Sequence, residues 1–409
     1  MGLGFTINAK IRDIREFQQI VDNEAVGAGY SVEHDESSST VSFCRLGDLF
    51  LNYQPAEYDT DDSVSVNGDC QTNMLGPGFH KAAIEFIDRL QQAANIEFEV
   101  EDETDYYTDR DFEAMKKDHF HKWLEKLFDV IQEQEAKGNK SLSICWDFYQ
   151  YYPQSEGGVV FSPLGSFRIS EVVARIQKDG IASFANDFFI WNNPERDARF
   201  HRGLALHALW EDCYFMPSQR SEKDARINGY IIAELEKAAS LNPSLPFPKK
   251  EYMELCQLHG CTPVSTEGIP LYETEFTIGY RRGIVNHKVG NIKFSLPGSY
   301  LRDIDEGTLI YYDGAADNWH TVRCTGYSVE GEPGYLDEDS EMIEEGVFEG
   351  GKYRLYDMGT YQDSEDEEPY SVYSCHVLCQ NQFTLFTVCA SRPEELKNLS
   401  QLIVSSFAV

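Results

Sequence analysis

A chain of 409 residues with 42% hydrophobic and 13% aromatic side chains can fill more than one hydrophobic core, which predicts a folded protein of two or three domains. Its 69 acidic and 35 basic side chains give a formal net charge of −34. A surface of that sign repels phosphate groups, so the composition argues against nucleic acids and anionic membranes as partners.

The acidic excess is bunched along the chain. Residues 330–368 hold fifteen acidic and two basic side chains, and residues 97–113 hold nine acidic side chains against Arg110 alone. Acidic patches speed association with basic proteins. We therefore expect discrete acidic faces, with a candidate partner surface in the last domain that consists of Asp337, Glu338, Asp339, Glu341, Glu365, Asp366, Glu367 and Glu368.

Residues 1–160 alternate between strand and helix patterns, which predicts an α+β domain. Strands are expected at 2–11, within 40–54 as a hairpin around Leu46-Gly47-Asp48, at 96–100 and at 141–148. Helices are expected at 13–27, from Pro77 and over about 109–135. Pro77 suits a first helical position, where its missing N–H costs nothing.

The predicted helix over 109–135 carries two histidines. Thr108 and Asp111 resemble a capping box with Asp in place of Glu, which places the start of the helix here. In an unbroken α-helix, His119 falls on the apolar stripe and His121 faces away. We therefore expect His119 in the core and His121 in solvent.

Residues 161–262 change to a helical pattern. Residues 203–216 are apolar on nearly all sides, which indicates a buried helix, and two further helices are expected at 222–241 and 249–258. The stretch Tyr230-IIAELEKAASLNP resembles the second half of a tetratricopeptide repeat, which implies a helical, repeat-like segment. The alternative is a helical hairpin packed onto the first domain.

After a connector at 261–271, residues 272–409 are mostly strand-like, with a hairpin turning near Asn381 and a helix from Pro393 to Phe407. The stretches Gly290-NIKFSLPGSY and FTLFTVCASRPEELKNLSQLIVSS resemble the PsbP-like α/β/α sandwich family. That resemblance implies a sheet closed by a terminal helix and a non-enzymatic role in binding other proteins. We interpret residues 330–368 as an acidic, loop-like insertion in this domain.

Two sites for small ligands are conceivable. An anion could bind at the start of the helix that begins at Pro77, through Gly76, Gly78, His80 and Lys81, although a tight strand-to-helix turn also explains the glycines. His207 and Glu211 stand four apart on one helix face and could share a metal with a third ligand. The alternative is a core histidine that hydrogen-bonds within the protein.

The remaining signals are weaker. The carboxylates at 102–113 lack the glycine and the bidentate glutamate of a calcium loop, so a solvated loop and helix start is the alternative to a cation site. Ten dispersed cysteines without a CxxC pair predict reduced, buried thiols in a cytoplasmic protein. The first residues lack the pattern of a signal sequence, and the chain shows neither a long apolar segment nor a nucleophile motif, so we expect a protein that is not exported.

These patterns favour an α+β multidomain, non-enzymatic cytoplasmic protein that binds another protein and needs no cofactor. One alternative is an acidic, immunity-type neutraliser of a basic protein. The other is a metal-dependent enzyme that uses His207 and Glu211 or the carboxylates at 102–113.

Overall fold

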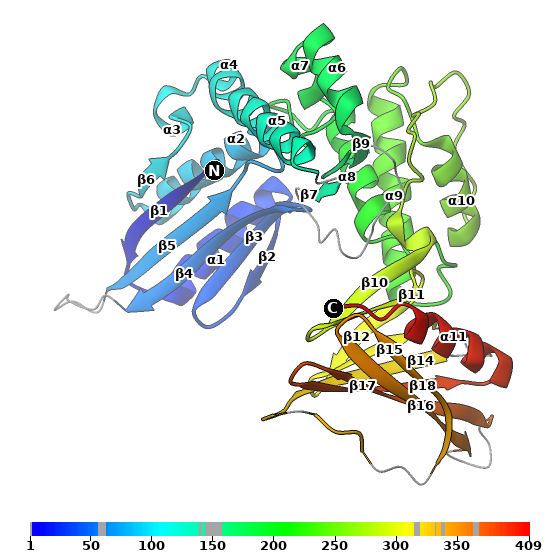
Figure 1. Ribbon diagram of the computed structural model, residues 1–409. Helices are drawn as coiled ribbons and strands as arrows, with labels where there is room; N and C mark the ends of the chain where they lie inside the picture. Colours follow the sequence, from blue (N-terminus) through cyan, green and yellow to red (C-terminus); the bar gives the residue numbers. More distant parts are fainter. Residues whose placement is uncertain are drawn as a thin grey trace.

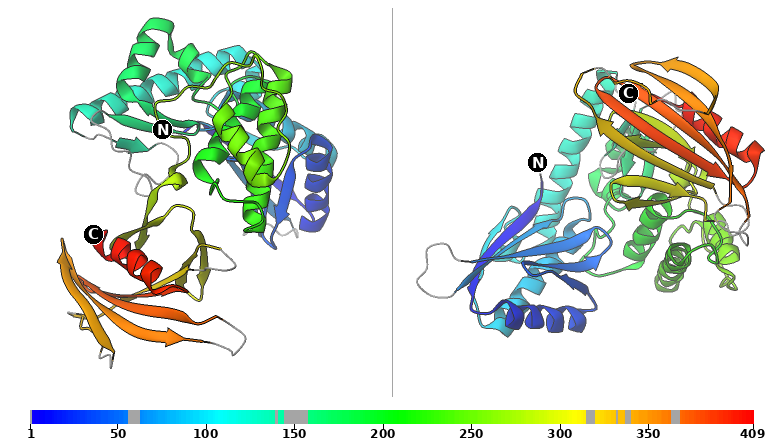
Figure 2. Two further views of the ribbon diagram at one scale, coloured as in Figure 1. Left: turned by 90° about the vertical axis from the view of Figure 1, so that its right-hand side faces the viewer. Right: turned by 90° about the horizontal axis from the view of Figure 1, so that it is seen from below.

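A computed structural model shows an α+β multidomain protein in which a helical region lies between an N-terminal and a C-terminal sheet (Figure 1, Figure 2). It describes residues 2–55, 63–138, 141–143, 158–314, 320–331, 333–336, 340–362 and 368–409.

The N-terminal sheet has six antiparallel strands in the order β2-β3-β4-β5-β1-β6. Their bounds are β1 (Gly4–Ile11), β2 (Ser31–His34), β3 (Ser38–Cys44), β4 (Gly47–Pro55), β5 (Val64–Gln71) and β6 (Glu99–Asp102). Helices α1 (Ile14–Ala28) and α2 (Pro77–Ala94) cover one face, to which β1 contributes Phe5, Ile7, Ala9 and Ile11. Alternate residues of β1 are exposed on the other face, as the period of two requires.

The predicted start of α2 is confirmed. Pro77 is its first residue and Gly76 precedes it with φ of 115°, a conformation that side chains with a Cβ rarely adopt. The predicted hairpin around Leu46-Gly47-Asp48 is also confirmed, because β3 and β4 pair across it.

The predicted single helix over 109–135 is wrong in its first half. The chain forms α3 (Tyr106–Asp109), α4 (Phe112–Met115), a π-helix (Lys116–His121) and α5 (Lys122–Ala136). Asp111 itself caps α4 by accepting a hydrogen bond from the Ala114 N–H at 3.0 Å. The wider π turn shifts the helical register, so His121 is buried and His119 is partly exposed, the reverse of our expectation.

The helical region begins with a small sheet. Strand β7 (Ser141–Ser143) lies parallel to β8 (Val159–Ser162), which pairs with β9 (Gly165–Arg168). The helices that follow are α6 (Ile169–Asp179), α7 (Ile181–Ala185), α8 (Ala198–Glu211), α9 (Glu222–Leu241) and α10 (Lys249–His259). The helices predicted at 222–241 and 249–258 are therefore confirmed, the second to within one residue.

Helix α8 is shared by two hydrophobic cores, which explains its all-round apolar character. Phe200 and Leu204 belong to a core that begins at Leu3, whereas Ala205 and Leu209 belong to a core with α9 and α10. The first of these cores continues across residue 160, where a domain boundary is predicted from the sequence. The helix ends at Glu211, five residues before the predicted end of the apolar stretch.

The C-terminal region consists of two antiparallel sheets and one helix. The hairpin β10 (Ile284–Val289) and β11 (Ile292–Pro297) follows a short 3₁₀ turn (Tyr280–Arg282). The larger sheet has the order β12-β13-β14-β18-β17-β16-β15. Its strands are β12 (Leu301–Asp305), β13 (Thr308–Tyr312), β14 (His320–Ser328), β15 (Glu341–Phe348), β16 (Gly351–Tyr361), β17 (Tyr370–Cys379) and β18 (Gln382–Ala390). Helix α11 (Pro393–Ser405) and β11 pack on one face of this sheet.

The interpretation of residues 330–368 as a loop-like insertion is wrong for residues 341–348, whereas the strand pattern of residues 352–359 is confirmed as part of β16. Residues 341–361 form β15 and β16, which extend the large sheet at one edge. Glu341 and Glu345 of β15 are exposed and Glu344 is partly buried, so the acidic character that suggested a loop is compatible with an edge strand.

Two arginines connect the regions. The Arg220 guanidinium, 5% exposed, pairs with Asp224 of α9 at 2.7 Å and donates hydrogen bonds to the carbonyl groups of Ser299 and Asp313. These contacts hold the helical region to the C-terminal region. On the other side, Arg196 donates to the carbonyl of Phe43 at 3.0 Å.

Candidate functional site

The glycine turn at the start of α2 is filled by protein. The Gly78 N–H donates to the carbonyl of Trp191 at 2.9 Å, and a Cβ on Gly78 would lie 2.1 Å from Cδ1 of the Trp191 ring. Lys81 pairs with Glu85 at 2.7 Å. Of the predicted anion-binding residues, Gly76, Gly78 and His80 are buried. The tight-turn alternative therefore accounts for the glycines, which allow the segment 189–193 to approach the helix.

His80 is the centre of a buried polar cluster. Its Nδ1 lies 3.0 Å from the hydroxyl of Thr72, and its Nε2 lies 3.0 Å from the hydroxyl of Thr104 and 3.1 Å from Oδ1 of Asp102. Burial alone would raise the pKa of Asp102, but the hydrogen bond and charge of His80, with the N–H groups of Tyr107 and Thr104, lower it to about 2. The cluster fastens α2 to the end of β6.

His207 and Glu211 contact each other. The Nδ1–H of His207 donates to the carbonyl of Pro163 at 2.9 Å, and Nε2 lies 2.5 Å from a carboxylate oxygen of Glu211. The hydrogen bond from His207 outweighs burial and lowers the pKa of Glu211. Both ring nitrogens are therefore engaged with protein oxygens, as the core-histidine alternative requires.

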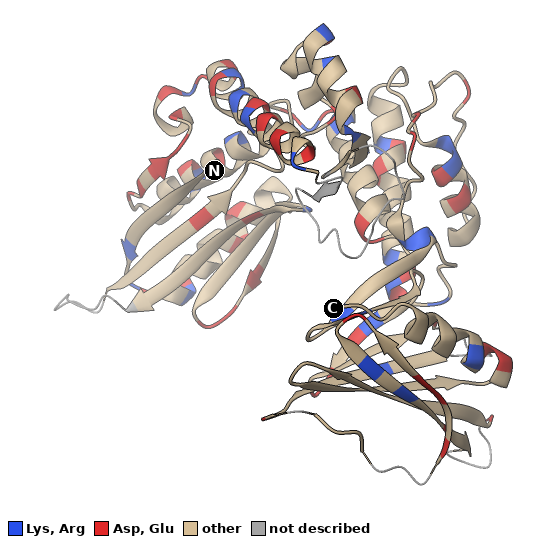
Figure 3. Ribbon diagram, in the orientation of Figure 1, with Lys and Arg blue, Asp and Glu red and all other residues tan. Residues whose placement is uncertain are grey.

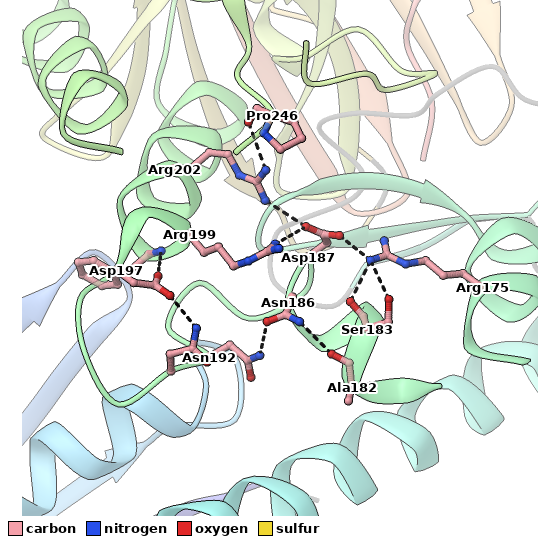
Figure 4. A network of polar contacts seen from close by, with 12 residues as sticks. Arg175, Ala182, Ser183, Asn186, Asp187, Asn192, Asp197, Arg199, Arg202 and Pro246 are labelled. Atoms are coloured by element: carbon pink, nitrogen blue, oxygen red, sulfur yellow. Dashed lines mark hydrogen bonds and ion pairs between the residues drawn. The ribbon is translucent and has the colours of Figure 1, made fainter. Parts of the chain in front are cut away.

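A second polar network surrounds Asp187, which follows α7. Three arginines converge on its carboxylate: Arg175 of α6 at 2.7 Å, Arg202 of α8 at 3.0 Å and Arg199 of α8 at 3.6 Å (Figure 4). Arg202 is 4% exposed and also donates to the carbonyl of Pro246. This network joins three helices and the loop before α10. The buried guanidinium of Arg202 is neutralised by the carboxylate of Asp187.

No sequence motif predicts this network. Arg175 and Asp187 are twelve residues apart and Arg202 follows on a different helix, so neither spacing matches a helical pair or a known motif. Four arginines within residues 175–202 of an acidic chain are the only pattern that points to it.

Acidic residues lie in every region of the protein (Figure 3). Of the predicted acidic partner surface, Glu341 and Glu368 are exposed, at the start of β15 and two residues before β17 respectively. The residues Asp337, Glu338, Asp339, Glu365, Asp366 and Glu367 lie outside the described part of the chain. Strand β15 adds Glu344 and Glu345, and Glu349 follows it.

Strand β15 is an edge strand with apolar side chains in solvent. In the described residues it pairs with β16 alone. Val347 is 84% exposed, Met342 is 50% exposed, and Ile343 is also exposed. These three exposed apolar side chains therefore lie close together on one strand. A β-bulge between Met342 and Glu344 interrupts the register.

Only some of the β15 carboxylates are neutralised within the protein. Glu345 pairs with Arg354 at 3.1 Å, and Glu344 accepts a hydrogen bond from the hydroxyl of Tyr353 at 2.5 Å. Burial and then this hydrogen bond raise the pKa of Tyr353, which keeps it a donor. Within the described chain, no basic side chain pairs with Glu341 or Glu349.

In the described residues, no group of three or more His, Cys, Asp and Glu side chains is arranged to hold a metal ion. The cysteines in this part of the chain form no disulfide, and burial raises the pKa of Cys70 and Cys213, which disfavours their thiolates. No helix in the same residues has the length and apolar character needed to span a membrane.

Comparison of the chain with models of protein families finds no match, and comparison with curated proteins finds none either. Function is therefore inferred from the charge, exposure and hydrogen bonding of these surfaces.

Proposed function

We propose that this chain is a non-enzymatic, cytoplasmic protein-binding protein whose edge strand β15 pairs with an extended, basic segment of a partner. The observation that carries the proposal is the exposed edge of β15, which combines unneutralised carboxylates with Met342 and Val347 in solvent. Strand addition is a common mode of peptide recognition, in which main-chain hydrogen bonds give affinity and side chains give specificity.

The backbone of β15 supports this mode of binding. An edge strand leaves alternate N–H and C=O groups unpaired along its outer side. Strand β15 has eight residues, which is longer than a typical strand. Its outer side can therefore form several main-chain hydrogen bonds with a partner strand. Each such bond contributes about 1 kcal/mol net.

The negative charge of β15 favours a basic partner segment. Two copies of this acidic strand repel each other, so the glutamates and the bulge at Met342 protect the edge against self-association. A strand with lysine or arginine at alternate positions meets no such repulsion. Its association is accelerated by the acidic surface at low ionic strength and slowed when salt screens the charges.

Two considerations from the sequence agree with this proposal. The resemblance of the C-terminal region to the PsbP-like family implies a binding role rather than catalysis. An immunity-type neutraliser of a basic protein would use the same chemistry, with the basic surface of the target as the segment that β15 captures.

A defined peptide tests the proposal. The probe is an eight-residue peptide, matched to the length of β15, that alternates lysine and valine. Isothermal titration calorimetry with the full chain is expected to show binding that weakens at least tenfold as salt rises to about 0.5 M. A glutamate-valine peptide and a lysine-valine peptide with N-methylated backbone groups are expected to show no heat.

Charge variants locate the binding surface. The double variant Glu341→Lys with Glu349→Lys is expected to weaken binding of the lysine-valine peptide about tenfold. The matched control, Glu267→Lys with Glu273→Lys, changes the net charge equally at exposed positions in and after the connector. If both double variants weaken binding equally, the peptide responds to net charge alone and the proposed site is wrong.

A further inference from the structure

The large C-terminal sheet has a cavity of about 400 Å³ on the face opposite α11. Its lining residues come from four neighbouring strands, β14, β18, β17 and β16 (Figure 1). Val322, Phe386 and Val388 point into the core beneath α11, so the residues that alternate with them, among them Thr321, Thr387 and Cys389, occupy the other face.

Strand register arranges the polar groups of this cavity in two rows. Thr321 is paired with Cys389, and Cys389 is paired with Val372, so these three residues form one row across three strands. Arg323 is paired with Thr387 in the next row on the same face. Positions fixed by a central sheet hold side chains more rigidly than positions on loops do.

Among the described residues, no carboxylate forms an ion pair with Arg323, although the chain has about twice as many acidic as basic side chains. Its guanidinium retains N–H donors that can bind a carboxylate with two parallel hydrogen bonds. The hydroxyl of Thr387 across the row is a further donor.

The side of the cavity away from Arg323 is aromatic and apolar. The rings of Tyr361 and Tyr370 stack at 6.2 Å with an angle of 27° between their planes, and Tyr361 is 46% exposed. Val372 contributes an apolar surface next to them. A planar ring can pack against these side chains while an attached anionic group reaches Arg323.

We propose that this cavity binds a small aromatic carboxylate, with its carboxylate on Arg323 and Thr387 and its ring against Tyr361, Tyr370 and Val372. The site is separate from the edge of β15 and does not depend on the proposed protein-binding function. A volume of about 400 Å³ lies within the range of small-molecule sites and accommodates a two-ring compound.

The test compares two probes that differ only in charge, 2-naphthoate and its neutral amide, 2-naphthamide. Calorimetric titration of the full chain is expected to show naphthoate binding about tenfold more tightly than naphthamide, the effect of one charge-assisted, partly exposed hydrogen-bonded pair. The variant Arg323→Gln is expected to reduce this ratio to about one. Arg302→Gln, at an exposed arginine of β12 outside the cavity, is expected to leave it unchanged.

A second readout places the ligand. Naphthoate is expected to slow the alkylation of Cys389 by iodoacetamide, followed residue by residue with mass spectrometry, but not that of the partly exposed Cys261. The proposal is overturned if neither probe binds, if both bind the wild-type chain equally, or if Arg323→Gln keeps the preference for naphthoate. Alkylation of Cys389 at the same rate with bound naphthoate would also overturn it.

Discussion

Nε2 of His80 lies 3.1 Å from Oδ1 of Asp102, with the two side chains 0% and 4% exposed. The Thr72 hydroxyl donates its proton to the carbonyl of Leu3, and the Thr104 hydroxyl donates to Asp102. His80 therefore lies between two hydroxyl groups and the carboxylate of Asp102, and its contact with Asp102 holds α2 to β6 inside the first core.

Replacing Asp102 with Asn would remove the buried carboxylate that lies against His80 and accepts hydrogen bonds from the N–H and hydroxyl of Thr104. We expect the free energy of unfolding to fall by about 3 kcal/mol, the usual cost of breaking one side of a buried pair. Urea unfolding followed by tryptophan fluorescence measures it. Glu101→Gln, at the neighbouring exposed position of β6, is the control and is expected to change stability by less than about 0.5 kcal/mol.

The same pair predicts an acid dependence. The pKa of Asp102 is about 2 in the folded protein against an ordinary value of 3.8, so the folded state binds fewer protons. Its contribution, about 2 kcal/mol, is present above about pH 4 and is lost as the pH falls towards 2. The stability difference between wild type and Asp102→Asn is therefore expected to shrink over this interval. A difference that stays constant down to about pH 2 would contradict the assignment.

Two glycines within helices, Gly78 of α2 and Gly27 of α1, should respond in opposite ways to alanine. A Cβ at position 78 meets the Trp191 ring and the Asn193 carbonyl, so Gly78→Ala is expected to destabilise the protein by more than about 2 kcal/mol. Gly27 lies in α1 with no atom near its added Cβ, and Gly27→Ala is expected to stabilise by about 0.5–1 kcal/mol. Thermal unfolding of both variants measures the two effects. Equal shifts in Tm would show that segment 189–193 does not pack closely against the start of α2.

Asp187 is the only carboxylate that pairs with the buried Arg202 in the described chain. Asp187→Asn is expected to destabilise the protein by about 3 kcal/mol. Adding Arg202→Met should recover part of this loss, because it removes the stranded charge while it keeps an apolar stem. Urea unfolding of both variants, with the exposed Glu195→Gln as control, measures the recovery. A double variant less stable than the single one would mean that Arg202 acts mainly through its packing.

Local sequence patterns predicted the regular elements well. Helix α9 was expected at 222–241 from its apolar spacing and ends where Asn242-Pro243 follows, and α2 was expected from Pro77. Both signals lie within the element itself. The reversed burial of His119 and His121 is not predictable in this way, because a π turn has no sequence signature comparable to a cap or a proline.

The functional surfaces depend on long-range pairing, which the sequence shows only indirectly. The acidic run at 330–368 was visible, but whether it forms a loop or an edge strand depends on its pairing with residues 370–379 through β16. Likewise, Thr321, Cys389 and Val372 share a row only because β14, β18 and β17 are neighbours. An alternation of hydroxyl and apolar residues in these strands was the available signal.

Hydrogen exchange at β15 tests the protein-binding proposal most directly. The main-chain amides of residues 341–348 are measured by mass spectrometry with and without the lysine-valine peptide, in the full chain. Strand addition predicts that amides facing away from β16 exchange at least tenfold more slowly with the peptide bound, because they then donate to its carbonyls. Bound peptide that leaves exchange in β15 unchanged, or that protects another strand instead, would contradict the proposal.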